Sequence, residues 1–309
     1  MFFFNVPLGI FGTFWAANRL REPKWEVKER KFDWIGTVTF LIGLSGVLMA
    51  FTYMSFGDPD MMFTVYIMSA IGLVGLAAFI FIQLRVAHPM MDLRLFKNRN
   101  YAVGNLTNLM NGLCIGAAMF LLIFYFQGPG GRDALTAGLL LIPSGLPMMI
   151  IGPISGKWSD MYGPKMLTAA GLALTTIALI GLAFIDVNTP LWQLVVLMII
   201  LGSGGGLFMS PNASSVMTSV PTERRGIASG ARIMLRNTGT MFSLAIAFPL
   251  VLTGLNPDDM YHIFLGEGVE SVGAEAILSL VNGLQDAFAI FAVISAASIP
   301  IALMMTNKK

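Results

Sequence analysis

Residues Ser155 to Leu167 read SGKWSDMYGPKML and form a short polar stretch between two long apolar ones. The sequence LLLIPSGLPMMIIGPI precedes it, and TAAGLALTTIALIGLAFI follows it. Glycine and proline break helices, so Gly163 and Pro164 predict a tight connection between two membrane-spanning helices. Such a connection does not explain Asp160. An acid between two helices can cap or face a helix N-terminus, where the helix dipole favours negative charge.

The composition extends this interpretation to the whole chain. Of its 309 residues, 56% are hydrophobic and 12% are charged, whereas soluble domains carry about 25% charged residues. The single cysteine, Cys114, and the two distant histidines, His88 and His262, form neither a disulfide framework nor a metal motif. No Ser/His/Asp set or carboxylate pair can be assembled within the apolar stretches. We therefore expect a membrane protein that is not an enzyme, has no cofactor or metal and binds no nucleic acid.

The apolar stretches predict the topology, because a helix needs roughly 20 residues to cross the hydrocarbon core. Eight stretches are long enough, namely residues 34–54, 62–84, 101–126, 136–156, 166–185, 191–215, 228–252 and 284–305, and a shorter apolar piece covers 2–17. Of the 19 lysines and arginines, all except Arg132 fall in alternate connections or in the C-terminal tail. The positive-inside rule predicts this distribution for a multi-pass protein of the cell membrane with a cytoplasmic C-terminus. The acidic connection 254–283 would be a solvated outer loop.

A glycine-rich sequence, LGSGGGLFMSPN from Leu201 to Asn212, superficially resembles a phosphate-binding loop. It lacks the lysine of such loops, no strand precedes it, and it falls inside a predicted span. Small residues are common where membrane helices approach one another closely. We therefore interpret this sequence as a site of close helix packing or of helix bending.

Three asparagines, Asn105, Asn108 and Asn111, recur at a spacing close to the helical period and predict one polar stripe on a membrane helix. Polar groups in hydrocarbon cost free energy unless they pair or face water, so the stripe should turn inward. Two interpretations remain equally open. The asparagines either form hydrogen bonds between helices, worth about 0.6 to 2 kcal/mol each, or line a substrate cavity.

Two arginines, Arg232 and Arg236, lie one helical turn apart in RRGIASGARIMLRNTG. If the membrane began near Gly226, Arg236 would lie about 15 Å deep at 1.5 Å per residue, at a cost of roughly 2.5 to 3.5 kcal/mol. Alternatively, the helix projects into the cytoplasm and both side chains snorkel to the interface. The second interpretation is favoured, because the 17 residues that follow are still close to the length of a span.

The polar stretch also resembles a family signature. GKWSDMYGPK is similar to the G-x-x-x-D-x-x-G-x-[KR] loop of the major facilitator superfamily at Gly156, Asp160, Gly163 and Lys165. Further sequences resemble successive landmarks of its fourteen-span drug:proton antiporter branch, namely FFFNVPLG, DWIG from Asp33, HPMMDLRLFKNRNYAVGN from His88, LTAGLLLIPSGL from Leu135, and VPTERRGIASG through RNTG to Gly239. One position departs from the family, because Met161 stands where arginine is frequent.

The resemblance implies an all-α polytopic membrane fold, with a six-helix C-terminal bundle preceded by two linker helices and a truncated helix. Residues 1–17 would end a truncated transmembrane helix, 18–33 would form a basic cytoplasmic loop, 34–99 would hold the two linker helices, and 100–309 would form the C-terminal transport bundle. The first six-helix bundle of the family has no counterpart in this sequence.

The same resemblance implies the C-terminal portion of a secondary active transporter. Such a transporter would export drugs or other small molecules in exchange for protons, by alternating access between two bundles. Its partners would be membrane lipid, a small-molecule substrate, and the missing N-terminal bundle or a separate chain that supplies it. The rival hypothesis is a non-transporting membrane partner, or a regulatory truncated product.

Roles for individual residues also come from the resemblance. A substrate cavity would be lined by Asn105, Asn108, Asn111, Ser203 and Gly204. The helix start and the surface between the two bundles would involve Arg225, Gly226, Arg236 and Gly239. The carboxylate of Asp160 would face a helix N-terminus of the opposite bundle.

Overall fold

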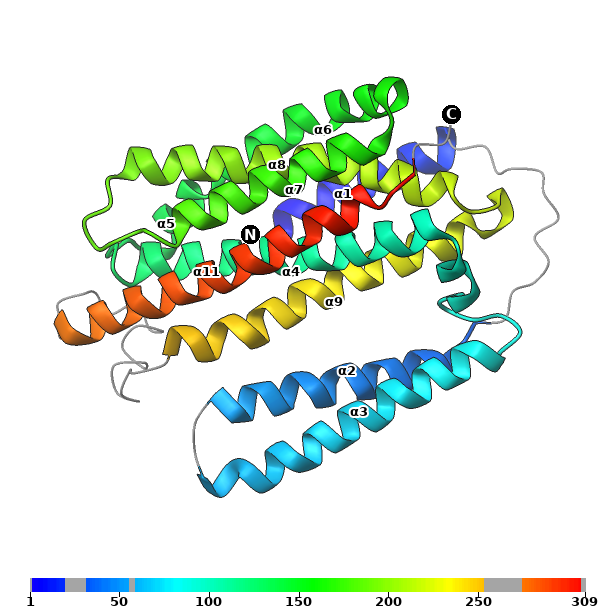
Figure 1. Cartoon of the computed structure of the whole chain (residues 1–309), viewed down its shortest axis with the longest axis horizontal. Coiled ribbons are helices and arrows are strands. Elements are labelled where there is room, and N and C mark those ends of the chain that lie inside the picture. Colours follow the sequence, from blue (N-terminus) through cyan, green and yellow to red (C-terminus); the bar gives the residue numbers. More distant parts are fainter. Residues whose placement is uncertain (1, 20–31, 56–58, 253–273, 307–309) are drawn as a thin grey trace. The chain divides into compact units, whose positions relative to one another are not determined.

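The computed structural model describes residues 2–19, 32–55, 59–252 and 274–306 (Figure 1). Three parts of the chain lie outside the described residues: 20–31 of the predicted basic loop 18–33, 254–273 of the predicted acidic loop 254–283, which includes His262, and Lys308 with Lys309. The chain divides into two units, Met1–Phe32 and Asp33–Lys309. The described part of the first unit is one helix, α1 (Phe2–Arg19).

The regular elements among the described residues of the second unit are all helices, which confirms the all-α prediction. Its long helices and short 3-10 turns are α2 (Trp34–Ser55), η1 (Pro59–Met61), α3 (Met62–Arg85), η2 (Leu93–Lys97), α4 (Arg99–Gln127), α5 (Ala134–Leu140), α6 (Ile142–Tyr162), α7 (Pro164–Leu182), α8 (Leu191–Thr218), η3 (Thr222–Arg224), α9 (Arg225–Leu252) and α11 (Ala274–Leu303). Seven helical segments of the described residues are long and apolar enough to cross a membrane, with α5 and α6 counted as one. The predicted span 228–252 forms α9, whose 28 residues include three arginines.

The polar stretch is more helical than expected. α6 continues to Tyr162, so Asp160 lies in its last turn and not in a loop. A single residue, Gly163, separates α6 from α7, and its φ of 85° belongs to the left-handed region that favours glycine. Pro164 then occupies the first turn of α7, where its missing N–H costs nothing. The predicted tight connection is therefore confirmed.

The connection between α4 and α5, which contains Arg132, ends in a helix cap that the sequence analysis did not identify. The Asp133 carboxylate accepts hydrogen bonds from the backbone N–H groups of Leu135 and Thr136 at the start of α5. The Thr136 hydroxyl also donates to this carboxylate, and these donors lower the pKa of the exposed Asp133 side chain below its ordinary value. Gly131, with a φ of 57°, provides the turn before the cap.

Helices α2 and α3 form a hairpin whose backbones touch. A Cβ atom added to Gly46 would lie 2.7 Å from the backbone nitrogen of Gly72, and one added to Gly75 would lie 2.7 Å from the Cα of Gly43. These distances are too short for any side chain, so glycine is required on both helices. At the other end of the hairpin, Asp33 accepts a hydrogen bond from the Nε2 of Gln83 at 2.7 Å.

Gly46→Ala is therefore expected to separate α2 from α3 and to lower the thermal unfolding temperature of the chain in detergent. The added methyl group would overlap backbone atoms, and such overpacking costs about 1 to 3 kcal/mol. Gly145→Ala is the matched control, because a Cβ at Gly145 meets nothing within 4 Å. Equal unfolding temperatures for the two variants would contradict the hairpin contact.

The remaining helices form a bundle around α4. α4 packs along α9 and α11, α8 packs between α6 and α7, and α2 lies against α9 (Figure 1). An apolar core fills the half of the bundle that contains the C-terminal part of α4, with the fully buried side chains of Leu121, Leu179 and Phe288 at its centre. The other half is richer in buried polar side chains.

Candidate functional site

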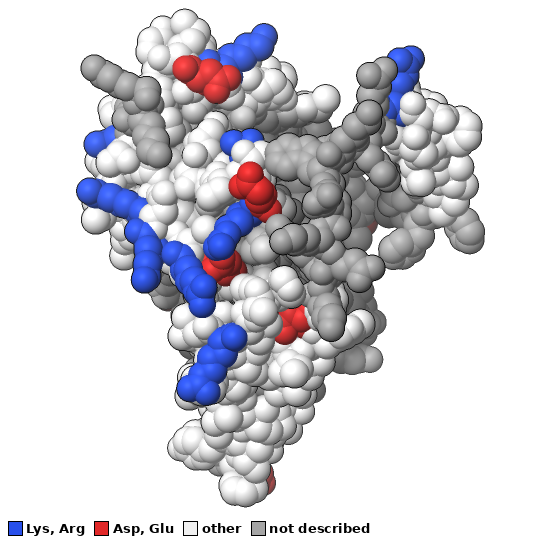
Figure 2. All heavy atoms as spheres, turned by 90° about the vertical axis from the view of Figure 1, so that its right-hand side faces the viewer, with Lys and Arg blue, Asp and Glu red and all other residues white. Residues whose placement is uncertain are grey.

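The connections that were predicted to be cytoplasmic meet at one end of the second unit. A cavity of about 640 Å³ at this end is lined by residues from the start of α4, the α6–α7 connection, the end of α8, and Thr306 after α11. Lys and Arg side chains gather on the corresponding face (Figure 2). The helix ends and connections at this end of the unit contain, for example, Lys97, Arg99, Lys157, Lys165 and Arg225. We call this end of the molecule the basic end.

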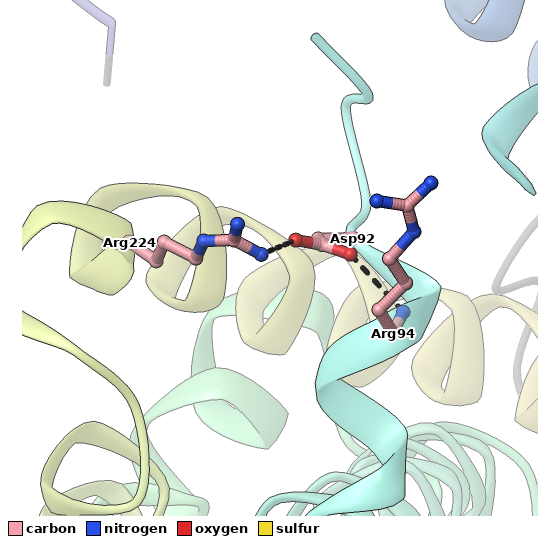
Figure 3. Close-up of polar contacts among 3 residues, drawn as sticks. All are labelled: Asp92, Arg94 and Arg224. Atoms are coloured by element: carbon pink, nitrogen blue, oxygen red, sulfur yellow. Dashed lines mark hydrogen bonds and ion pairs between the residues drawn. The ribbon is translucent and has the colours of Figure 1, made fainter. Parts of the chain in front are cut away.

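Three contacts between distant segments hold the basic end together. The Asp92 carboxylate forms an ion pair with Arg224 and accepts a hydrogen bond from the Arg94 backbone nitrogen (Figure 3). Asn98 caps α4 and donates from its Nδ2 to the carbonyl of Ser219 at 2.8 Å. Asn100 donates to the carbonyl of Thr306 at 2.9 Å. These roles cannot be predicted from local sequence, because each partner lies more than 100 residues away.

The four positions of the loop signature have different environments. Gly156 allows α6 to approach α8, because a Cβ there would lie 2.7 Å from the Oγ of Ser210. Gly163 makes the turn between α6 and α7, and Lys165 is half-buried in the first turn of α7. Asp160 is exposed and lines the 640 Å³ cavity.

Asp160 does not cap α7, the helix that begins nearest to it in the sequence. α7 begins without a side-chain cap, and the Asp160 carboxylate forms no hydrogen bond or ion pair with another residue of the described ranges. Its carboxylate is therefore available to a group outside the described residues.

The three asparagines of the predicted stripe are all buried on α4, with at most 2% of their surface exposed. The Nδ2 of Asn105 donates to the Tyr101 carbonyl on its own helix at 3.0 Å. The Nδ2 of Asn108 crosses to α9 and donates to the Arg232 carbonyl at 2.8 Å, so Asn108 forms the hydrogen bond between helices that one interpretation predicts. The Nδ2 of Asn111 and the Oδ1 atoms of Asn105 and Asn108 have no protein partner.

A fourth asparagine, Asn212, links three helices and was not singled out as a site residue. It is fully buried on α8. Its Nδ2 donates to the Gly104 carbonyl at 2.9 Å and to the Thr107 Oγ1 at 3.2 Å on α4, and its Oδ1 accepts from the Nε of Arg232 on α9 at 3.5 Å. We call Asn105, Asn108, Asn111, Thr107, Asn212 and Arg232 the polar cluster. The sequence feature that could have identified Asn212 is its amide side chain within a predicted membrane span.

The glycine-rich sequence is a packing surface. A Cβ at Gly204 would lie 2.6 Å from the Thr175 Oγ1 and 2.8 Å from the Gly171 carbonyl oxygen, both on α7. Gly204 therefore packs against α7 and does not line a cavity with the asparagines of α4, which corrects the role expected from the family. Ser203 is half-buried, and its hydroxyl donates to the Ile199 carbonyl of its own helix. The interpretation as close helix packing is confirmed.

The residues expected at the helix start and interdomain surface are divided between two places. Arg225 and Gly226 are exposed at the start of α9, at the basic end. Gly239 is buried, and a Cβ on it would clash with the Leu109 carbonyl of α4. Gly239 thus packs inside the bundle and does not belong to an interdomain surface. Arg236 is half-buried, and its backbone lies against Gly112 of α4.

The arrangement combines a buried polar cluster with an open basic end. The cluster provides amide groups without protein partners and a guanidinium group that is bound only to neutral acceptors. Such groups can bind polar parts of a ligand or water. Within the described ranges, no group of His, Cys, Asp and Glu side chains could hold a metal ion.

Comparison with known proteins identifies the family. The sequence model of the Major Facilitator Superfamily matches residues 1–244. The riboflavin transporter RibZ of Clostridioides difficile (strain 630) is 31% identical over 251 residues, which cover 80% of this chain and 52% of RibZ. The lincomycin resistance protein LmrB of Bacillus subtilis (strain 168) is 27% identical over 274 residues, which cover 85% of this chain and 57% of LmrB.

The multidrug resistance protein Stp of Mycobacterium tuberculosis (strain ATCC 25618 / H37Rv) is 28% identical over 249 residues, which cover 80% of this chain and 45% of Stp. This chain spans about half the length of the curated relatives that it matches. Membership of this family indicates a transporter protein and not an enzyme. The chain therefore belongs to the Major Facilitator Superfamily, in the branch that contains the drug transporters.

Proposed function

We propose that this chain supplies the C-terminal six-helix bundle of a secondary transporter, which exports drug-like small molecules in exchange for protons. Transporters of this architecture rock two bundles around a site between them, so the bundle described here requires an N-terminal bundle, in the same chain or in a separate one. The observation that carries the proposal is the family match over residues 1–244. The names of RibZ, LmrB and Stp support a small-molecule substrate.

The exposed face of α6 supports the need for a second bundle. Only 11% of the α5–α6 span is buried, against 50% of the α4, α7 and α8 spans. The open face of α6 carries Gly145 and Gly152, where an added Cβ would meet nothing within 4 Å. Small residues on an open face allow another membrane helix to approach closely. We assign this face to contact with the N-terminal bundle.

The distribution of charge supports the proposed orientation. Lys and Arg side chains gather at the basic end (Figure 2), and such residues are retained on the cytoplasmic side of cell membranes. The structured C-terminal residue Thr306 also lies at this end, against Asn100. We therefore place the basic end and the C-terminus in the cytoplasm. The substrate would enter from this side.

Drug efflux in cells tests the proposed function. The second bundle can be supplied by the LmrB complement, which we define as the part of Bacillus subtilis LmrB that this chain does not match. Cells without their own drug exporters should resist lincomycin when they produce both polypeptides as a complex, and not when they produce this chain alone. If the complex assembles without efflux, and the chain instead changes the amount or activity of intact LmrB, the rival function as a non-transporting partner is supported.

The role proposed for Asp160 gives a sharper prediction. Asp160→Asn should reduce efflux by the complex at least about tenfold, because the mutation removes the charge that would face a helix N-terminus of the second bundle. It should leave the unfolding temperature of the isolated chain unchanged, because Asp160 is exposed at the end of α6.

Asp286→Asn is the matched control for this variant, since Asp286 is an exposed acid on α11. Unfolding of the isolated chain at a lower temperature after Asp160→Asn would instead favour a local capping role. Efflux that is equally reduced by Asp286→Asn would exclude a specific role for Asp160.

A further inference from the structure

The proposed transport function does not account for the two arginines of α9. Arg232 lies seven residues after the start of α9, which corresponds to about 10 Å along the helix, and Arg236 lies one turn further. The guanidinium group of Arg232 does not extend toward the basic end. Its Nη2 donates to the Met209 carbonyl at 3.3 Å, and Met209 precedes the last residue of α8 by nine positions, or about 13 Å. Two hydrogen bonds therefore hold the Arg232 side chain against α8.

Neither arginine has a negatively charged partner among the described residues. α4 and α8, which contact these two arginines, and α9 itself contain no aspartate or glutamate. Arg232 is bound to two neutral oxygen atoms, those of Met209 and Asn212. The side chain of Arg236 forms no hydrogen bond or ion pair within the described ranges. A half-buried positive charge without a partner is costly in a membrane protein and typically marks a functional site.

A second observation points to a ligand at the same level of the bundle. The Nδ2 of Asn111 is a hydrogen-bond donor without a protein partner, and Asn111 is only 2% exposed. Its neighbour Gly112 packs directly against Arg236, since a Cβ at Gly112 would lie 3.1 Å from the Arg236 Cγ. Two arginines one turn apart on α9 and an unpaired amide donor on the neighbouring α4 favour an acceptor that carries negative charge.

We propose that Arg232 and Arg236 bind the anionic group, a carboxylate or a phosphate, of an amphiphilic small molecule. The inference rests on the proposed transport function, because it assigns a class of substrate to the same bundle. Arginine binds carboxylate and phosphate through two parallel hydrogen bonds, and the positive potential of the basic end raises the local concentration of anions. The apolar part of the ligand would lie toward the apolar core.

Binding to the purified 309-residue chain in a nonionic detergent tests this inference. Three probes share one alkyl chain and differ in the head group: decanoate, decyl phosphate and decyltrimethylammonium. At low salt, the two anionic probes should raise the unfolding temperature by about 3 to 5 °C near saturation, and the cationic probe should not. The shift should decrease as salt screens the charges.

Charge-removing variants locate the site. Arg232→Gln and Arg236→Gln should each weaken the binding of decyl phosphate at least about tenfold, and Arg232→Lys should weaken it less than Arg232→Gln because it keeps the charge. Arg225→Gln, on the same helix but exposed, is the matched control and should bind normally. Arg236→Gln keeps the test valid if Arg232→Gln fails to fold, because the Arg236 side chain is not part of the polar cluster.

Several results would overturn the inference. These are equal stabilisation by the cationic probe, unchanged affinity in the Arg232→Gln/Arg236→Gln double variant, or an equal loss of affinity in Arg225→Gln. A phosphatidylglycerol that displaces decyl phosphate would identify the source of the anion as a lipid head group, and failure to displace it would identify a soluble amphiphile. Because binding needs no second bundle, loss of transport in the efflux assay with normal probe binding would refute the proposed function and leave this inference intact.

Discussion

Gly204→Ala should destabilise the helix bundle strongly, whereas the same change at the adjacent Gly205 should be tolerated. An added Cβ at Gly204 would lie 2.6 Å from the Thr175 Oγ1 and 2.8 Å from the Thr175 backbone nitrogen. The backbone nitrogen cannot move without displacing α7. An added Cβ at Gly205 would meet its nearest neighbour, the Cδ1 of Ile115, at 3.4 Å, which is an ordinary contact.

The difference in unfolding free energy between Gly204→Ala and Gly205→Ala reports the close packing of α8 against α7. We expect Gly204→Ala to cost about 1 to 3 kcal/mol of unfolding free energy, the range for overpacked interiors, and Gly204→Val to cost more. Thermal unfolding of the purified chain in detergent, followed by circular dichroism, would measure both. If Gly204 lined an open cavity, as the family resemblance led us to expect, Gly204→Ala and Gly205→Ala would unfold at the same temperature.

Asn212→Leu is expected to loosen the junction of α4, α8 and α9. The leucine would remove the two hydrogen bonds that Asn212 donates to α4 and the one that it accepts from Arg232. Hydrogen bonds between membrane helices contribute about 0.6 to 1.7 kcal/mol each, and the unpaired groups left behind add to the loss. We therefore expect a loss of about 2 to 4 kcal/mol and faster backbone hydrogen exchange at the start of α4.

Asn237→Leu is the matched control, because Asn237 is an exposed asparagine on α9. It should leave the unfolding temperature close to that of the unmodified chain. A double-mutant cycle with Arg232→Gln adds a second check. The effects of Asn212→Leu and Arg232→Gln should be less than additive if the two side chains interact, and strictly additive effects would exclude the hydrogen bond between them.

The sequence was most informative where the cause of the structure is local. Gly163 and Pro164 predicted the turn between α6 and α7, because a left-handed φ and a missing N–H are properties of single residues. The lengths of the apolar stretches predicted the helices, because a span requires a fixed number of residues. The observed helix ends differ from the predicted ones where a polar segment remains helical, as it does from Ser155 to Tyr162 at the end of α6.

The sequence was less informative where the cause is a contact between distant segments. Asn98, Asn100 and Asn212 each bond to a partner more than 100 residues away, and no local pattern encodes such a pairing. The family resemblance assigned Gly204 to a cavity because that role belongs to a two-bundle transporter, whereas the immediate neighbour of Gly204 is α7. The direction of the Arg232 side chain depends on the position of α8, which the sequence of α9 does not contain.

The central claim is that this bundle transports only together with a second one, and proton-driven efflux from liposomes tests it most directly. Three samples would be reconstituted separately: this chain, its purified complex with the LmrB complement, and intact LmrB. The liposomes would be loaded with labelled lincomycin and subjected to an imposed pH gradient. The account predicts gradient-dependent lincomycin movement with intact LmrB and with the complex, and none with this chain alone. Gradient-dependent transport by this chain alone, or a well-assembled complex that transports nothing, would contradict the account.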